Sequence, residues 1–176
     1  MTAMNDKSLR DSRLVFYKED VDSIDAILDA FLKQSAAKCA LLIDKDGHMV
    51  TQRGHTKQID LDTISALVAG SFAATREMAK LLGEDEFSAL FHQGKSDNIQ
   101  LSLVGDRALL TAIFDDATTV GMVRLYAAEA AKRLATLFQR KAANAGSAVH
   151  TAGVAGADDQ AFRKGAANSL DNLFGK

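Results

Sequence analysis

Few side chains in this 176-residue chain are of types and spacings that could do chemistry. Gly94-Lys95-Ser96 resembles the end of a phosphate-binding loop, in which backbone N–H groups and a lysine hold phosphates. The glycine that such a loop needs five positions earlier is replaced by Ala89. The segment also lies between two predicted strands rather than between a strand and a helix. These departures argue against a nucleotide-binding loop.

Asp44-Lys45-Asp46-Gly47 has the beginning of a calcium-binding loop, in which carboxylates at alternate positions ligate the ion. The further acidic ligands and the closing glutamate of such a loop are missing. Asp-Gly is also a strong signal for a two-residue hairpin turn. We therefore interpret this segment as a hairpin turn.

The remaining reactive side chains have plain structural explanations. Cys39 is the only cysteine and lies in an apolar segment typical of a core strand. Asp115-Asp116 could act as a base or hold a metal, but capping of a following helix explains the pair as well. The histidines lack the spacing of metal ligands. They are His48, His55, His92 and His150. We expect a protein that is not an enzyme and that uses no metal and no cofactor.

The composition argues against several classes of partner. Apolar residues make up 47% and charged residues 25%, with a net charge of −2 and a pI of about 6.1. This balance is ordinary for a globular domain and provides no basic field for nucleic acid or anionic lipid. A single cysteine excludes an internal disulfide and suits the cytosol. No apolar run approaches the roughly 18 residues that span a membrane. We expect a cytoplasmic domain.

Hydrophobic periodicity predicts the elements that must position these residues. Short connections between the strands predict an α+β domain, in the order α-β-β-α-β-β-β-α, with an antiparallel five-stranded sheet and helices packed on it. Asp60 or Asp62 is expected to cap the second helix, and Gly83 to end it. The predicted helices cover residues 18–36, 60–82 and 120–142, and the strands 38–44, 48–53, 86–92, 98–104 and 108–115.

The ends of the chain differ in composition from the domain predicted over residues 14–142. Residues 1–13 are polar and predict a disordered arm. Residues 143–157 are mostly Ala and Gly without Asp, Glu, Lys or Arg, and predict a flexible linker. Residues 158–176 predict an amphipathic helix. A short helix of this kind is marginal alone, so we expect it to bind a partner. Its apolar side includes Phe162, Leu170, Leu173 and Phe174.

The helix predicted over residues 60–82 has an unusual second side. At 100° per residue its apolar positions form the side expected to pack on the sheet. These are Leu61, Ile64, Leu67, Val68, Phe72, Met78 and Leu82. The opposite side has small residues followed by charges: Ala66, Ala69, Gly70 and Ala73, then Arg76, Glu77 and Lys80.

These small residues favour an interface, because they allow another backbone to approach closely. A glycine inside a helix costs about 1 kcal/mol relative to alanine and therefore needs a reason. Alanine on a solvated helix face is the plain alternative. Arg76 beside them could stabilise phosphoryl transfer in a partner, although a surface charge explains it as well.

Several segments together resemble the roadblock/dynein light chain family, and within it the bacterial MglB proteins. They are CALLIDKDGHMV, TISALVAGSFAATREMAKLLGEDEF, HQG and ALLTAIFDDATTVGMVRL. The terminal FRKGAANSLDNLFG is similar to the C-terminal helix of MglB proteins. The resemblance covers residues 14–138 and continues in this tail.

The resemblance implies a roadblock fold, with the sheet between helices, and a homodimer whose sheets join edge to edge. The implied dimer interface includes Phe87, Ala89, Phe91, Gly70 and Ala74. The resemblance also implies an activator of an MglA-type small Ras-like GTPase, in cell polarity or motility, with two protomers on one GTPase and no arginine finger. The implied GTPase-binding residues are Ala66, Ala69, Gly70, Ala73, Arg76, Glu77 and Lys80, with Phe162, Leu170, Leu173 and Phe174 of the tail.

Two alternatives stay open. A roadblock scaffold would bind a GTPase or another partner without stimulating hydrolysis. A small-molecule sensor would need a pocket with convergent polar groups beneath a helix. The predicted core is almost wholly apolar, which argues against the sensor.

Overall fold

A computed structural model describes residues 18–56 and 59–152 and confirms the predicted order of elements. The first half contains α2 (Lys18–Ser35), β1 (Cys39–Asp44), β2 (Met49–Gly54) and α3 (Leu61–Leu81). The second half contains β3 (Ala89–Gln93), β4 (Asn98–Val104), β5 (Ala108–Phe114) and α4 (Val120–Ala152). The sheet, α2, α3 and α4 as far as Thr136 belong to one compact unit, and the chain from Leu137 onward belongs to a second.

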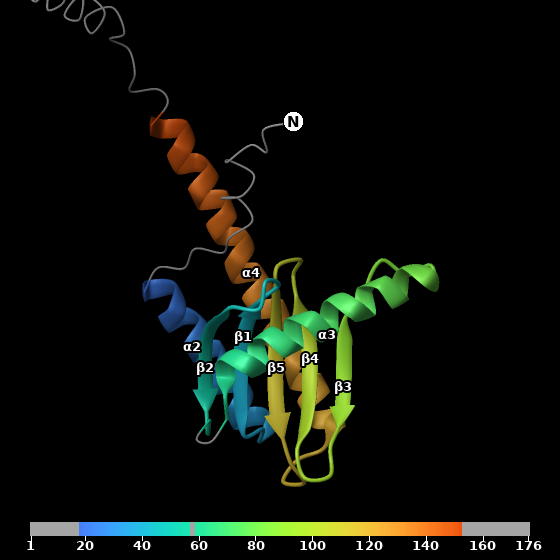
Figure 1. Cartoon of the computed structure of the whole chain (residues 1–176). Helices are drawn as coiled ribbons and strands as arrows, with labels where there is room; N and C mark the ends of the chain where they lie inside the picture. The colour runs from blue at the N-terminus through green and yellow to red at the C-terminus, as the bar shows by residue number, and fades with distance from the viewer. Residues whose placement is uncertain (1–17, 57–58, 153–176) are drawn as a thin grey trace, which may run out of the picture. The chain divides into compact units, whose positions relative to one another are not determined.

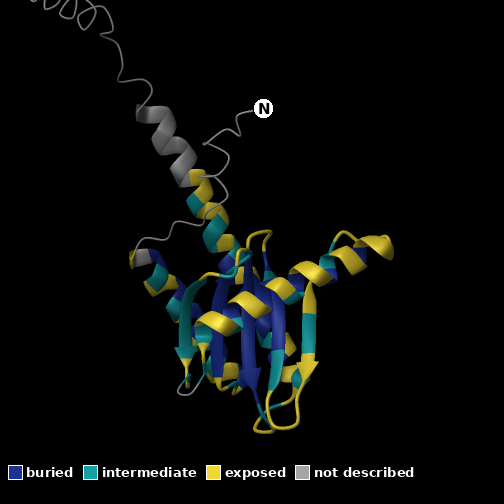
Figure 2. Ribbon diagram, viewed as in Figure 1, coloured by how far each residue is buried: buried dark blue, intermediate teal, exposed yellow. Residues whose placement is uncertain are grey.

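The sheet has the strand order β2-β1-β5-β4-β3, and every neighbouring pair is antiparallel. α3 covers one face, while α2 and the first part of α4 cover the other (Figure 1). The central strands β1 and β5 are almost continuously apolar because both of their faces are buried. Figure 2 shows this burial in the central strands and its loss toward the edges. β2 and β3 are thus the two edge strands.

Alternation along the strands divides the core into two layers. The layer beneath α3 contains Val68 and Phe72 of the helix together with Cys39, Leu41, Ile43, Leu101, Leu109 and Ile113 of the sheet. The layer on the other face includes the buried Leu28 and Phe31 of α2 and Leu134 of α4. The sheet is therefore sandwiched between helices, as the resemblance implied.

The predicted ends of α3 are confirmed in their chemistry. Asp60 is the N-cap, and one oxygen of its carboxylate accepts a hydrogen bond from the Thr63 backbone N–H at 3.1 Å. Hydrogen bonds from Thr63, first from its hydroxyl and then from its backbone N–H, lower the pKa of Asp60. Gly83 follows the helix with φ +80°, and its N–H donates to the Lys80 carbonyl at 3.1 Å.

The linker predicted over residues 143–157 is wrong in its first part, because α4 continues to Ala152. Alanine is the best helix former, and a single Gly146 costs only about 1 kcal/mol. Low charge and small side chains therefore do not end a helix that is already formed. Residues 1–13 and 153–176, and with them the predicted arm and terminal helix, lie outside the described residues.

Candidate interaction surface

The orientation of α3 differs from the predicted one. Leu67, Met78 and Leu82 were expected to face the sheet, yet they are 67%, 51% and 73% exposed. The buried positions of the helix are Ser65, Val68, Ala69, Phe72, Thr75 and Ala79. The C-terminal part of α3 extends past β3 (Figure 1), so its apolar side chains have no strand of this protomer beneath them.

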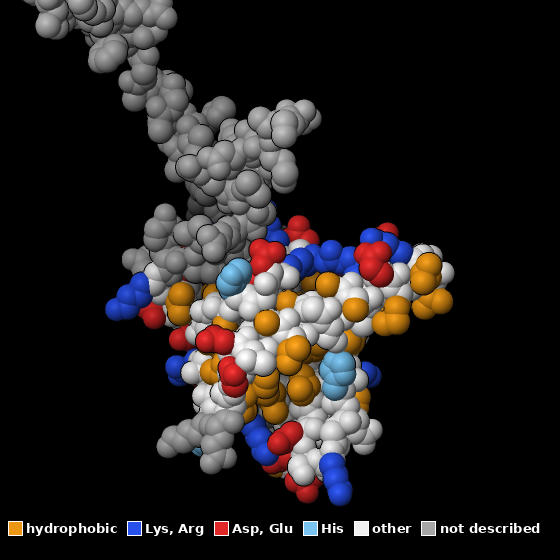
Figure 3. Space-filling view, in the orientation of Figure 1, with side chains coloured by type: hydrophobic (Ala, Val, Ile, Leu, Met, Phe, Trp, Pro, Cys, Tyr) orange, Lys and Arg blue, Asp and Glu red, His pale blue; other side chains and the backbone are white. Residues whose placement is uncertain are grey.

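The outer face of α3 therefore presents small and large apolar side chains to solvent. Ala66, Gly70, Ala73 and Ala74 are exposed, and we name them the small-residue patch. The exposed Leu67, Met78, Leu81 and Leu82 lie on the same helix, with Leu81 88% exposed. Figure 3 shows apolar side chains along this helix and on the sheet beside it.

Two of the small residues of α3, Ala66 and Ala69, pack against another part of the same protomer. Gly47, in the β1–β2 turn, has φ +93°, and a Cβ added there would lie 3.1 Å from the Cα of Ala66. The same atom would lie 3.5 Å from the Cβ of Ala69. The turn thus packs closely on α3. Ala69 is only 7% exposed, so its predicted place on the outer, partner-binding side is wrong.

Gly70 has no such internal explanation. A Cβ added at Gly70 would meet nothing within 4 Å. Alanine would therefore fit there and would favour the helix by about 1 kcal/mol. Among the described residues, no neighbour of Gly70 requires glycine at this position.

Arg76, predicted to lie near the contact surface, forms an ion pair in the structure. Its Nε is 3.5 Å from Oε2 of Glu86, a long ion pair that holds the half-buried side chain near the segment before β3. Lys45 Nζ approaches the same oxygen at 4.0 Å. Arg76 is thus turned from the outer face, because Glu86 offers it a partner near the sheet. Glu77 and Lys80 are exposed and pair with each other at 2.8 Å.

The edge strand β3 pairs on one side only, with β4. The Ser88 carbonyl accepts the Leu103 N–H at 2.9 Å, so alternation points the backbone groups of Ala89, Phe91 and Gln93 toward the free edge. The side chain of Ala89 is exposed. The Phe91 ring instead packs on Phe114, with centroids 6.2 Å apart. Phe87 is half-buried and Ala74 is exposed.

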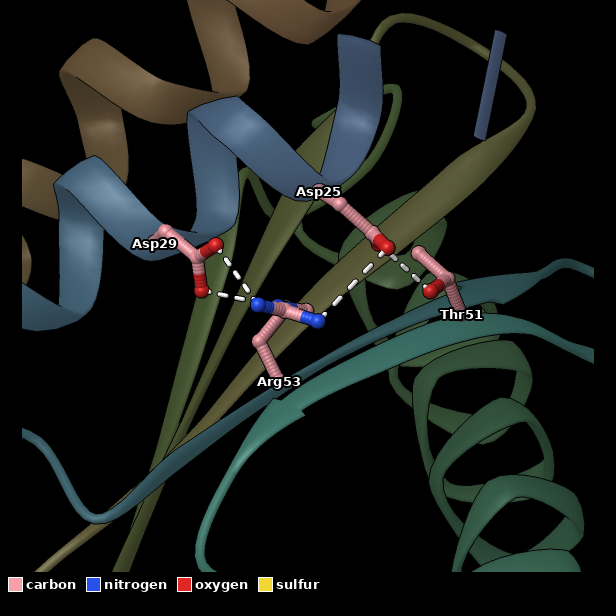
Figure 4. Close-up of polar contacts among 4 residues, drawn as sticks. All are labelled: Asp25, Asp29, Thr51 and Arg53. Atoms are coloured by element: carbon pink, nitrogen blue, oxygen red, sulfur yellow. Dashed lines mark hydrogen bonds and ion pairs between the residues drawn. The ribbon is translucent and has the colours of Figure 1, made fainter. Parts of the chain in front are cut away.

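The other edge strand, β2, is tied to α2 by charge (Figure 4). Arg53 donates from Nε and Nη2 to the two carboxylate oxygens of Asp29, at 2.7 and 2.8 Å. Its Nη1 is 3.8 Å from Asp25, which also accepts a 2.6 Å hydrogen bond from the Thr51 hydroxyl. The bonds to Asp29 raise the pKa of Arg53.

The other chemical candidates have structural roles. Sequence spacing missed that His48 joins Asp44 and Asp46, with one ligand atom from each within 4.8 Å of the others. Asp44 Oδ1 accepts backbone N–H groups of Asp46 at 3.0 Å and His48 at 2.8 Å, so its carboxylate closes the hairpin turn. Cys39 is buried, and burial raises its pKa to about 11, which suppresses the reactive thiolate.

The Asp115 carboxylate also has a structural role. Its carboxylate lies 2.9 Å from Lys38 Nζ and accepts the Ala117 N–H at 3.0 Å. The hydrogen bond from Lys38 lowers the pKa of Asp115. Lys38 contacts Asp97 as well, at 2.7 Å. Asp115, which follows β5, is therefore held by Lys38, which precedes β1.

Comparison with known proteins decides the family. The model of the Roadblock/LC7 domain matches residues 23–114. The chain belongs to the Roadblock/LC7 family. Within the described ranges, no helix of this roadblock protein has the length and apolar character needed to cross a membrane.

Solved structures extend this result to MglB. Myxococcus xanthus MglB is 38% identical with a TM-score of 0.65, and the match covers 67% of this chain and 96% of that one. The gliding protein MglB of Thermus thermophilus is 35% identical with a TM-score of 0.69, covering 72% and 96%. The predicted resemblance to MglB is thus confirmed.

A Roadblock/LC7 domain from Streptomyces avermitilis shares the fold alone, at 15% identity and a TM-score of 0.59, covering 65% of this chain and 97% of that one. A search of curated proteins returned no match. Phe162, Leu170, Leu173 and Phe174, predicted to bind a partner, lie outside the described residues.

Proposed function

We propose that this roadblock protein is a cytoplasmic, homodimeric activator of an MglA-type small Ras-like GTPase and is not itself an enzyme. Its similarity to two MglB proteins supports a GTPase-associated regulatory role. The observation that carries the proposal is Gly70, which no described residue of the protomer requires to be glycine. We assign the contact with the GTPase to the outer face of α3 and to the tail. The residues are Ala66, Gly70, Ala73, Glu77 and Lys80, with Phe162, Leu170, Leu173 and Phe174.

The proposed dimer joins two β3 edges. The free edge groups of β3 can pair with those of a second copy, and two-fold symmetry brings the overhanging ends of both α3 helices toward each other. Met78, Leu81 and Leu82 would then lose their exposure to water. Two small-residue patches would form one continuous surface, which fits one GTPase on two protomers.

The proposed activation needs no arginine from this protein. Arg76 already pairs with Glu86, and moving it toward a nucleotide would break that contact. We propose instead that the dimer binds the hydrolysis-competent conformation of the GTPase better than the resting one. Such differential binding raises the population of the active conformation and so the hydrolysis rate. Control of cell polarity or motility is the proposed process, and the name of the Thermus relative, a gliding protein, supports it.

Single-turnover GTP hydrolysis by an MglA-type GTPase from the same genome tests the proposal. The unaltered protein and Arg76→Ala are expected to accelerate hydrolysis equally. Ala73→Arg places a long cation in the small-residue patch and is expected to abolish both binding and acceleration. Ala26→Arg, at an exposed alanine of α2, is the matched control and is expected to leave both unchanged.

Each other outcome contradicts a defined part of the proposal. Loss of acceleration in Arg76→Ala with binding retained would establish an arginine finger. Binding without acceleration by the unaltered protein would establish the scaffold alternative. Normal binding by a folded Ala73→Arg protein would remove the small-residue patch from the interface.

A further inference from the structure

A groove lies on the face of the sheet opposite α3, between α4 and the strands β3 and β4. Its volume is about 560 Å³. Ala128, Ala131 and Ala135 form the α4 wall, and Ala89 and Ser102 contribute to the strand side. Walls of small residues let another backbone approach closely. This groove has no part in the proposed contact with the GTPase.

Two cations line the groove without an acidic partner. Arg124 Nε is 3.3 Å from Oε1 of the buried Gln100, and the Arg124 guanidinium lies 5.9 Å from the centre of the Phe91 ring. Lys132 lines the groove two helical turns further along α4. Across residues 18–56 and 59–143, neither cation pairs with a carboxylate. Eight residues at 1.5 Å each place their backbones about 12 Å apart.

Ser102, a serine of β4, also lines the groove. Ser102 is only 7% exposed, and its side chain makes no hydrogen bond to any residue that the structure describes. Its hydroxyl oxygen reaches solvent in the groove, since it is not one of the fully buried polar atoms that lack a partner. The neighbouring Gln100 Nε2 is satisfied by the Leu101 carbonyl at 2.9 Å. Ser102 therefore presents a hydroxyl that a polar side chain of a partner can reach.

The dimensions and charges favour a helix as the occupant. Each strand occupies about 4.8 Å of the sheet, so β3 and β4 together form a strip about 10 Å wide. This width matches the 8–10 Å that separates the axes of packed helices. Cations about 12 Å apart are too distant for one phosphate. They match carboxylates seven or eight residues apart on a helix.

We propose that this groove binds an acidic amphipathic helix of a partner protein, laid beside α4 with its carboxylates at Arg124 and Lys132. A polar side chain of that helix bonds Ser102. Pairing of β3 edges extends the sheet within its own plane and leaves this face uncovered. The protein then joins a GTPase on one face to an acidic partner on the other.

A display library of 18-residue helical peptides, randomised on one face and selected on the full-length protein, tests this site. We expect enrichment of peptides with two acidic residues seven or eight positions apart. Their dissociation constants should rise roughly tenfold for Arg124→Gln and for Lys132→Gln, and should rise with added salt. Arg133→Gln, an exposed arginine of α4 that does not line the groove, is the matched control and should bind normally.

Thermal unfolding of each variant checks that the fold is intact. Ser102→Ala removes the hydroxyl without adding bulk to the groove, and should weaken the same peptides severalfold. Recovery of peptides without the acidic pair would overturn the proposal. Equal binding by the two groove variants, or failure to recover any binder, would overturn it as well. GTP hydrolysis measured on the same variants separates this site from the α3 surface, because it should be unchanged.

Discussion

The two edge strands of the sheet, β2 and β3, differ in their surroundings. At β2, Arg53 binds Asp29 with two hydrogen bonds and lies near Asp25, so the edge strand is tied to α2 by charge (Figure 4). At β3, the free backbone edge lies below an overhanging helix with the exposed Met78 and Leu81 (Figure 1).

This difference indicates that β2 stays unpaired on its outer side and that β3 pairs with another chain. Exposed strand edges invite association, and charged side chains are a common means of preventing it. The β2 edge has that protection. The β3 edge combines free hydrogen-bonding groups with apolar surface, the features of an interface.

Ala89→Pro should have the largest effect on this comparison. Proline removes an N–H that points to the free edge of β3, and two-fold symmetry introduces the change on both sides of the dimer. We expect the dimer dissociation constant to rise at least about 100-fold, measured by analytical ultracentrifugation. The β3–β4 pairing should survive, because that N–H takes no part in it.

Gln52→Pro is the matched control at the other edge. The His55 N–H donates inward to the Lys38 carbonyl, so alternation points the Gln52 N–H outward. This variant should remain dimeric. Dissociation by Gln52→Pro and not by Ala89→Pro would reverse the assignment of the edges.

Leu81→Glu should weaken the dimer by roughly tenfold, because it introduces a charge into the apolar end of α3. Sedimentation at several concentrations measures the change, and thermal unfolding of the isolated protomer should be little affected. Leu125→Glu, at a leucine of α4 that is 62% exposed, provides the control. An equal rise of the dimer dissociation constant in both variants would show that the exposed end of α3 has no particular part in the dimer.

Arg53→Met should lower the melting temperature by a few degrees and leave the dimer intact. The substitution keeps an apolar stem but removes the bonds to Asp29, and exposed ion pairs contribute little each. Arg53→Lys should restore only part of the loss, because lysine cannot bind a carboxylate with two fixed donors. A change in dimer affinity without a change in melting would contradict the separation of the two edges.

Acid should weaken the contacts at the strand ends, where Asp115 is paired with Lys38. The pKa of Asp115 is lowered in the folded protein by Lys38, so its contribution to stability is present above the ordinary aspartate pKa. That contribution is lost as pH falls below about 4. The urea midpoint should therefore fall between about pH 5 and pH 3, and fall less in Asp115→Asn. Equal slopes would exclude Asp115 as the group responsible.

Much of the fold was readable from the chain because local rules decide it. Periodicity predicted each helix and strand that the structure describes, with β4 at its observed bounds, and Asp60 and Gly83 marked the ends of α3. Cap and turn chemistry depends on neighbouring residues, which a sequence shows directly. The sequence also distinguishes Gly70 from its neighbours, because a glycine inside a helix is costly wherever the helix lies.

Only the tertiary structure decided which neighbours the side chains of α3 and α4 contact. The exposure of Leu67 and Met78 depends on the angle at which α3 crosses the sheet and on where β3 ends. The burial of Ala69 depends on the turn at Gly47. The pairing of Arg76 with Glu86, and of Arg53 with Asp29, joins residues whose separation along the chain carries no signal. Periodicity reports that a helix has an apolar side, but packing against long-range partners determines which side is covered.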